Sequence, residues 1–260
     1  MTQAAKAGTP LSPAGEAEWA LFLDFDGTLV DIVERPEAVS VDPELPVILA
    51  RLKERLGGAL AIISGRPISF LDRRLEPFAF DIGGLHGLEH RIGDRLYQCQ
   101  PEEHPRLREM ADRLGEVLAL KTGVVIEDKG CSVALHWRLA PQEKDFVLST
   151  AQAAAEALGV DYRVQYGKAV AEILPAVAGK GRVIETFLQQ SPYRGRRPIF
   201  AGDDLTDENG FATINDHGGL SIRIGAGETI ARERLGTPAD LRHSLSKWAA
   251  GGPLPFTGDR

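Results

Sequence analysis

Short apolar stretches along the chain end in clusters of polar residues, and a segment with helical periodicity follows each cluster. This alternation is typical of α/β proteins with a doubly wound, Rossmann-like parallel sheet. In such sheets ligands bind outside the carboxyl ends of the strands. We therefore expect the polar clusters to meet at one edge of the sheet. The stretches are WALFLDFDG (19–27), GALAIISGR (58–66) and RPIFAGDD (197–204).

The middle of the chain has a different pattern, in which each of two helical segments is followed by two strands. This pattern predicts a separate antiparallel sheet with helices on one face, an α+β cap domain inserted at 105–175. The parallel-sheet core is then formed by 18–104 and 176–250, and the polar ends 1–17 and 251–260 are expected to be flexible tails. Helices are predicted at 103–120 and 142–158, and strands at 124–128, 132–139, 161–165 and 169–174.

Composition narrows the class of protein. The chain has 260 residues, of which 43% are hydrophobic and 26% are charged, as in soluble globular proteins. Its 30 basic and 37 acidic residues give a net charge of −7, and no basic stripe is present, which argues against nucleic acid as a partner. A phosphorylated partner is therefore expected to be a small molecule.

Cysteine usage and hydropathy suggest a compartment. Cys99 and Cys131 are the only cysteines and form no CxxC motif, so we expect neither a disulfide scaffold nor a structural zinc site. This usage suits a reducing compartment. The chain shows neither an apolar run long enough to span a membrane nor the pattern of a secretory signal at its start. We therefore expect a cytoplasmic protein without a membrane partner.

Two carboxylates follow the first apolar stretch, at Asp24 and Asp26. Residues two apart in an extended chain face the same way, so both carboxylates crowd one side of a water-poor edge. Such a pair requires a cation or a shared proton. The alternative is that Asp26-Gly27 forms a simple turn, although a turn alone does not explain the acid pair.

Ser64 and Lys180 each stand close to the start of a predicted helix. Ser64 precedes Pro67, which suits the first position of a helix, and the N–H groups of a helix start bind phosphate. The residues leave open whether Ser64 is only a helix cap. Lys180 opens the helix 182–189, where a cation opposes the helix dipole, so we expect an anion beside it.

The last polar cluster, GDDLTDE (202–208), holds four carboxylates within six positions. Their mutual repulsion favours a bound hard dication, although some of them are also suited to capping the following helix. Two acidic clusters, a serine and a lysine at one sheet edge indicate phosphoryl transfer to an aspartyl nucleophile with Mg²⁺.

In this order DFDGTL (24–29), the Ser64 turn, Lys180 and GDDLTDE resemble the four motifs of the haloacid-dehalogenase-like superfamily. More narrowly, the chain from about Ala20 to Trp248 resembles the trehalose-6-phosphate phosphatases. Leu174 and Val177 depart from that family's usual Lys or Arg and Gly. The narrower resemblance rests on GLHG (84–87), EDK (127–129), ALHWR (134–138), Gly167-Lys168 with Glu172, and GDDLTDENGF (202–211).

The resemblance implies a role for each motif residue. Asp24 is expected to be the nucleophile, and Asp26 the general acid and base. Phosphate is expected to be bound by Thr28, Ser64 and Lys180. Mg²⁺ is expected to be held by Asp24, the Asp26 carbonyl oxygen and Asp203. Metal-bound water and Lys180 are expected to be oriented by Asp204 and Asp207.

The cap is expected to recognise the sugar. In SVALHWRL (132–139) the residues Val133, Leu135 and Trp137 share one face, which we expect to pack on helices. The resemblance places the substrate among polar residues of the cap and of the cleft between the domains; a purely structural histidine is the alternative for one of them, His86. These residues are Arg66, His86, Glu89, Glu127, Lys129, His136, Arg138, Lys168 and Glu172.

The expected activity is hydrolysis of trehalose 6-phosphate to trehalose and phosphate, the last step of trehalose synthesis, with the cap closing over the core. The expected protein is a monomer whose partner is a disaccharide phosphate. One alternative is a related capped phosphatase acting on sucrose phosphate or glucosylglycerol phosphate. Another is a phosphosugar-binding sensor without turnover, which Mg²⁺-dependent phosphate release from a substrate panel would exclude.

Overall fold

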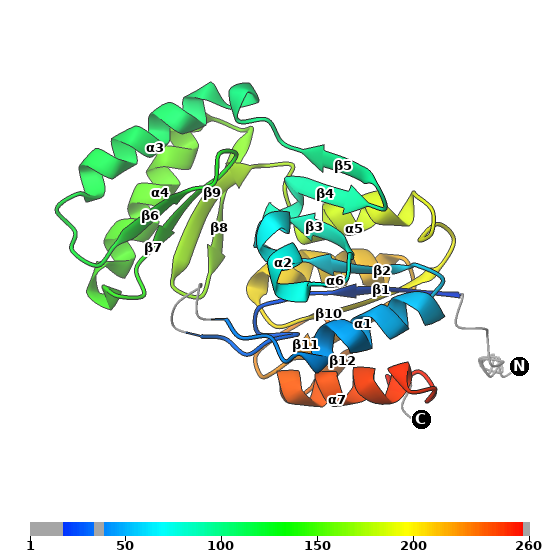
Figure 1. Ribbon diagram of the computed structural model, residues 1–260. Coiled ribbons are helices and arrows are strands. Elements are labelled where there is room, and N and C mark those ends of the chain that lie inside the picture. The colour runs from blue at the N-terminus through cyan, green and yellow to red at the C-terminus, as the bar shows by residue number, and fades with distance from the viewer. Residues whose placement is uncertain (1–17, 34–38, 257–260) are drawn as a thin grey trace, which may run out of the picture.

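The computed structural model describes residues 18–33 and 39–256. Figure 1 shows a core unit (18–104 and 176–256) and a smaller cap unit (105–175) with its own sheet. The predicted tails at 1–17 and 257–260 lie outside the described residues. Within 251–256, Phe256 is buried and packs edge-on against the Trp248 ring.

The core unit is built on an eight-stranded sheet in the order β12-β11-β10-β1-β2-β3-β4-β5. Neighbouring strands from β12 to β3 pair in parallel, whereas β4 and β5 continue the sheet in antiparallel pairing. The doubly wound parallel core is thus confirmed. The strands are β1 (Trp19–Leu23), β2 (Leu60–Ile63), β3 (Asp81–Gly84), β4 (Glu89–Ile92), β5 (Arg95–Gln98), β10 (Arg197–Gly202), β11 (Leu220–Ile224) and β12 (Glu233–Leu235).

Helices cover both faces of this sheet (Figure 1). Alternate residues of β1 point into different apolar cores: Leu21 and Leu23 contact the core with α1, α2 and α7, and Phe22 contacts the core with α5 and α6. A strand buried on both faces explains the continuous apolar stretch that the sequence shows. The helices are α1 (Glu44–Arg55), α2 (Ile68–Leu75), α5 (Lys180–Leu188), α6 (Glu208–Asp216) and α7 (Pro238–Ala249).

The cap unit contains a four-stranded antiparallel sheet in the order β6-β7-β9-β8. Helices α3 and α4 lie on one face of this sheet (Figure 1), where Val133, Leu135 and Trp137 pack against them as predicted. The opposite face is left for polar residues directed at the core unit. The elements are α3 (Pro105–Leu118), β6 (Val125–Asp128), β7 (Val133–His136), α4 (Lys144–Leu158), β8 (Tyr162–Gly167) and β9 (Val170–Pro175).

The described part of the chain contains no helix with both the length and the apolar character needed to cross a membrane.

Cys99 and Cys131 form a disulfide, which their positions in the sequence did not indicate. Cys99 follows β5 in the core unit, and Cys131 lies between β6 and β7 in the cap unit. The two residues are 32 positions apart, so no local spacing motif marks them as partners. Folding of the cap unit over the end of β5 brings them together.

Tyr193 is a fully buried anchor between elements of the core. Its hydroxyl oxygen lies 2.6 Å from the Asp81 carboxylate and 3.0 Å from the Leu60 carbonyl oxygen. Burial raises the pKa of Tyr193, and the hydroxyl therefore stays protonated as a donor.

Replacing Tyr193 by Phe is expected to lower the free energy of unfolding by about 1–3 kcal/mol, because a buried carboxylate loses its donor. Urea denaturation measures this change. Tyr166→Phe is the control, because that hydroxyl bonds Gln152 at an exposed position; its expected effect is within about 0.5 kcal/mol. Equal unfolding free energies for the two variants would contradict the assignment.

Candidate active site

The residues that follow β1 form a tight loop whose acidic side chains face the cleft. Asp24 is 3% exposed, and its Oδ2 accepts a hydrogen bond of 2.9 Å from the Thr28 hydroxyl. The Gly27 N–H donates to the Val30 carbonyl oxygen at 2.8 Å, so the Asp-Gly pair is a turn as well as part of an acidic site. Gly27 has a φ of 82°, and a Cβ there would collide with the Asp203 carboxylate. Glycine therefore allows the two acidic loops to approach each other.

Lys180 lies at the start of α5 and is 3% exposed. Its Nζ donates to Asp24 Oδ1 at 2.6 Å and to Asp207 Oδ1 at 2.5 Å. Burial alone would lower the pKa of Lys180, but the charges of Asp207 and Asp24 outweigh it and raise the pKa. The anion expected beside this lysine is thus present as two carboxylates.

Asp207 orders the loop between β10 and α6. Its carboxylate is fully buried, and Oδ2 accepts hydrogen bonds from the backbone N–H groups of Asp203 at 3.0 Å and Asp204 at 2.9 Å. The other oxygen holds Lys180. Of the duties expected for Asp207, the structure shows the orientation of Lys180.

Three carboxylates in this site can hold a metal ion together, because Asp24, Asp203 and Asp207 offer oxygen atoms within 4.8 Å of one another. Burial raises the pKa of Asp24; Lys180 lowers it, and the neighbouring carboxylates add to the rise. Burial also raises the pKa of Asp203. Burial makes the negative charge of these carboxylates unfavourable. A hard dication such as Mg²⁺, which prefers oxygen ligands, fits them because it would neutralise that charge.

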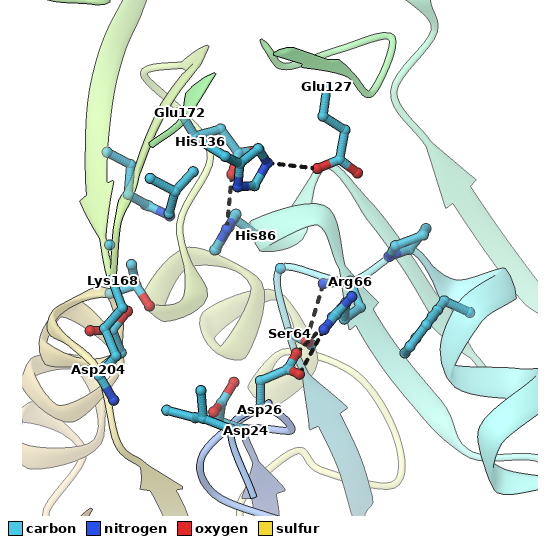
Figure 2. A pocket seen from close by; sticks show the side chains of 18 of the residues that line it. Asp24, Asp26, Ser64, Arg66, His86, Glu127, His136, Lys168, Glu172 and Asp204 are labelled. Carbon is cyan, nitrogen blue, oxygen red and sulfur yellow. Dashed lines mark hydrogen bonds and ion pairs between the residues drawn. The ribbon is translucent and has the colours of Figure 1, made fainter. Parts of the chain in front are cut away.

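Arg66 pairs with Asp26, the second acidic residue of the loop after β1. Its Nε and one Nη donate to the two carboxylate oxygens of Asp26 at 2.8 and 2.9 Å, and Figure 2 shows this pair at the cleft. The Arg66 backbone N–H donates to Ser64 Oγ at 3.1 Å, which orients that hydroxyl within the same turn. The sequence suggested Arg66 as a substrate-binding residue, and the structure shows an Asp26-orienting contact in addition.

Glu89 does not line the cleft among the described residues, contrary to the expectation from the resemblance. Its Oε1 accepts from the Ile68 N–H at 2.5 Å, and its Oε2 accepts from Gln98 at 3.2 Å. The carboxylate thus binds the N-terminus of α2, where free N–H groups for phosphate were expected. Helix α2 begins at Ile68, too late for Ser64 to cap it.

His86 connects three parts of the site. Its N–H donates to the Ser64 carbonyl oxygen at 3.0 Å, and its own carbonyl oxygen accepts from Gly179 at 2.7 Å. Its Nε2 lies 3.3 Å from Glu172 of the cap unit, a contact visible in Figure 2. His86 has a φ of 56°, which is unusual outside glycine. The residue therefore has both a structural role and a position in the cleft.

The polar face of the cap sheet meets His86 through Glu172, which is 4% exposed. Its carboxylate lies 2.6 Å from Ser132 Oγ and 3.3 Å from Lys129 Nζ. Burial would raise the pKa of Glu172, but Lys129 and His86 outweigh it and hold the pKa well below its usual range. Beside it, His136 Nε2 pairs with Glu127 at 3.0 Å (Figure 2).

Two further side chains of the cap unit reach the core unit. Lys168 Nζ lies 2.7 Å from Asp203 Oδ2, and Arg138 donates to the Val33 carbonyl oxygen at 2.9 Å. Both contacts cross the cleft. The structure thus has the cap unit docked on the acidic edge of the core sheet.

A cavity of about 380 Å³ lies between the two units. Thr28 and Asp207 do not line the cavity, but each contacts a residue that does: Thr28 contacts Asp24, and Asp207 contacts Lys180. Sequence reasoning missed Phe70 of α2, whose ring centroid lies 4.6 Å from the Arg66 guanidinium; Arg66 precedes α2, so helical spacing does not mark the pair. The expected site residues that line the cavity are Asp24, Asp26, Ser64, Arg66, His86, Glu127, Lys129, His136, Arg138, Lys168, Glu172, Lys180, Asp203 and Asp204.

Comparison with known sequences agrees with this geometry. Residues 22–241 match the family described as trehalose-phosphatase. The chain belongs to the trehalose-phosphatase family. Members of this family are phosphoric monoester hydrolases, and the chain is an enzyme of that class.

Individual relatives cover most of the chain. A "Probable trehalose-phosphate phosphatase" of Sinorhizobium fredii (strain NBRC 101917 / NGR234) is 46% identical over 84% of this chain and 82% of its own length. "Trehalose-6-phosphate phosphatase" of Escherichia coli (strain K12) is 39% identical over 88% and 86%. A crystal structure of a trehalose-6-phosphate phosphatase related protein superposes with a TM-score of 0.71 at 28% identity, covering 89% of this chain and 97% of that one.

The Lys180 cluster predicts a large difference between two lysines of the site. Lys180→Met is expected to lower the free energy of unfolding by about 3–5 kcal/mol, because it leaves two buried carboxylates without their cation. Lys168→Met is the matched control: its side chain is 53% exposed, and loss of its pair with Asp203 is expected to cost within about 1 kcal/mol. Urea denaturation at neutral pH measures both. Similar values for the two variants would contradict the central role of Lys180.

Proposed function

We propose that the enzyme is a Mg²⁺-dependent phosphatase that hydrolyses trehalose 6-phosphate to trehalose and phosphate through an aspartyl-phosphate intermediate. The observation that carries this proposal is the Asp24 carboxylate, held 2.6 Å from a buried ammonium group on the floor of a cavity with a polar roof. The names of the relatives support the substrate. The reaction completes trehalose synthesis.

In the first half of the reaction, an oxygen of Asp24 attacks phosphorus and the bond to the sugar 6-oxygen breaks. Thr28 and Lys180 already contact the two oxygens of this carboxylate and so fix its orientation. Lys180 also offsets the negative charge that gathers as one anion approaches another. Ser64, which is 1% exposed at the cavity wall, offers its hydroxyl to the phosphate.

Asp26 serves as the general acid and then as the general base. It gives its proton to the departing sugar oxygen, and in the second half it takes a proton from the water that attacks the aspartyl phosphate. Arg66 holds both oxygens of Asp26 at the cavity, so its charge stabilises the carboxylate that remains after proton transfer. Arg66 is thus a positioning residue for Asp26.

The carboxylates of Asp24 and Asp203 and the carbonyl oxygen of Asp26 would hold Mg²⁺. The acidic loops after β1 and β10 converge there; burial raises the pKa values of Asp24 and Asp203, and the neighbouring carboxylates add to the rise. When bound, the ion supplies positive charge for the transferring phosphoryl group. Asp204 lines the cavity and would orient water beside that ion.

The sugar is expected against the polar face of the cap sheet. Glu172 and Lys129 form a buried ionic pair there, and the Glu127–His136 pair lies beside it (Figure 2). Carboxylates and cations at fixed positions match the donors and acceptors of sugar hydroxyls. Because one chain supplies both walls, we further infer that the enzyme works as a monomer. We also infer that the enzyme works in the cytoplasm, because its proposed substrate is a phosphorylated biosynthetic intermediate.

Substitution of the nucleophile tests the chemistry. Asp24→Asn is expected to lower turnover by more than about 10⁴-fold and to prevent formation of a labelled phosphoenzyme in acid-quenched reactions. Asp31→Asn is the control, because Asp31 is exposed and pairs with Arg242 outside the cavity; it should retain activity. Substantial turnover by Asp24→Asn would remove Asp24 from the nucleophile role.

A substrate panel tests the specificity. Phosphate release is measured from trehalose 6-phosphate, sucrose 6-phosphate and glucosylglycerol phosphate, each with Mg²⁺ and with a chelator. We expect trehalose 6-phosphate to have the highest kcat/KM and chelation to abolish release. Preference for another disaccharide phosphate would favour a related capped phosphatase. Tight binding of the sugar phosphate without release in any condition would favour a sensor.

A further inference from the structure

The Cys99–Cys131 disulfide joins the two units at their junction. The backbone crosses between the core unit and the cap unit twice, at 99–104 and at 176–179. The disulfide adds a third covalent connection beside these two. Because the chain has two cysteines in total, any thiol chemistry of the protein belongs to this pair.

Both ends of the disulfide are anchored. The Cys99 N–H donates to the Leu88 carbonyl oxygen at 2.8 Å, which fixes Cys99 to the core unit. Cys131 is 3% exposed and packs with Leu88, Leu174 and Ala178 in a small apolar cluster at the junction. The bond therefore constrains the position of the β6–β7 loop relative to the core sheet.

That loop also carries part of the proposed sugar site. Lys129 and Ser132 flank Cys131 closely in the chain, and both contact the Glu172 carboxylate. Glu172 in turn meets His86 of the core unit at 3.3 Å. The disulfide at Cys131 therefore constrains the side chains that connect the cap unit, at the roof of the cavity, to the core unit at its floor.

A second cavity gives solvent molecules a route to the disulfide. It has a volume of about 360 Å³ and lies at the junction, with Cys99, His104 and Gly179 in its wall. One side-chain atom each of Cys99, Cys131 and His104 lie within 4.8 Å of one another, so the imidazole ring is next to the two sulfur atoms. His104 is itself positioned by Tyr162, 2.7 Å away.

We propose that Cys99–Cys131 is a reversible redox switch that restrains the cap unit: the disulfide holds the cap unit docked, and reduction to two thiols lets it open further. The reductant is a dithiol. One of its thiolates attacks Cys99 Sγ, the sulfur bond breaks, and Cys131 leaves as a thiolate that takes up a proton. The second thiol of the reductant then displaces Cys99, so the dithiol becomes a disulfide and supplies two electrons and two protons.

The effect of the disulfide on turnover, through restraint of the cap unit, rests on the proposed function. The docked state includes the contacts from Lys168 to Asp203 and from Arg138 to Val33, which close the cavity. Product release requires these contacts to break. Where opening limits the rate, the reduced enzyme turns over faster than the oxidised enzyme.

The experiment compares full-length protein oxidised with oxidised glutathione and protein reduced with dithiothreitol. Thiol titration under denaturing conditions should find none in the oxidised protein and two in the reduced protein. Small-angle X-ray scattering should give a larger radius of gyration after reduction, and kcat for trehalose 6-phosphate should at least double. Cys99→Ser and Cys131→Ser, made separately, should match the reduced protein in both measurements and should not respond to either reagent.

Scattering and thiol titration do not depend on the substrate, so a failure of the proposed function would leave them informative. Equal scattering and equal kcat in the two redox states would overturn the switch. Two free thiols after treatment with oxidised glutathione would overturn the disulfide itself. So would one equivalent of zinc that protects the thiols, which would make the pair and His104 a metal site.

Discussion

Lys180 is the buried cation of the acidic edge and lies between the carboxylates of Asp24 and Asp207. A buried carboxylate or ammonium group left alone costs several kcal/mol, so each of the three residues depends on the others. They come from α5, from the loop after β1 and from the loop before α6. Folding of the core therefore assembles the proposed phosphate site, and the stability of the fold and the proposed chemistry rest on the same contacts.

This edge could be predicted from sequence for a geometric reason. The carboxyl ends of parallel strands meet at one side of a sheet, so polar residues that follow β1, β2 and β10 are brought together whatever the length of chain between them. Burial of β1 on both faces leaves a continuous apolar stretch that marks its end at Asp24. The alternation in SVALHWRL likewise fixed which face of β7 packs on the helices.

Contacts between distant polar residues could not be predicted in the same way. Glu89 is charged and lies near the cleft in the sequence, but its carboxylate accepts a hydrogen bond from the Ile68 N–H and does not line the cavity. Cys99 and Cys131 carry no spacing signal, because their partnership depends on where the cap unit docks. Leu174 departs from the family pattern and is fully buried beside Cys131, where a charged side chain would have no partner in the junction cluster.

His86 connects the two halves of the proposed site, and this connection bears on specificity. The backbone of His86 bonds the Ser64 loop and Gly179, next to Lys180, while its side chain meets Glu172 of the cap unit. Inorganic phosphate would touch the floor of the cavity alone, whereas a disaccharide phosphate also touches the roof. Binding energy from the sugar can thus be used to hold the cap unit against the phosphate site, which favours the transition state of the correct substrate over that of a smaller phosphate ester.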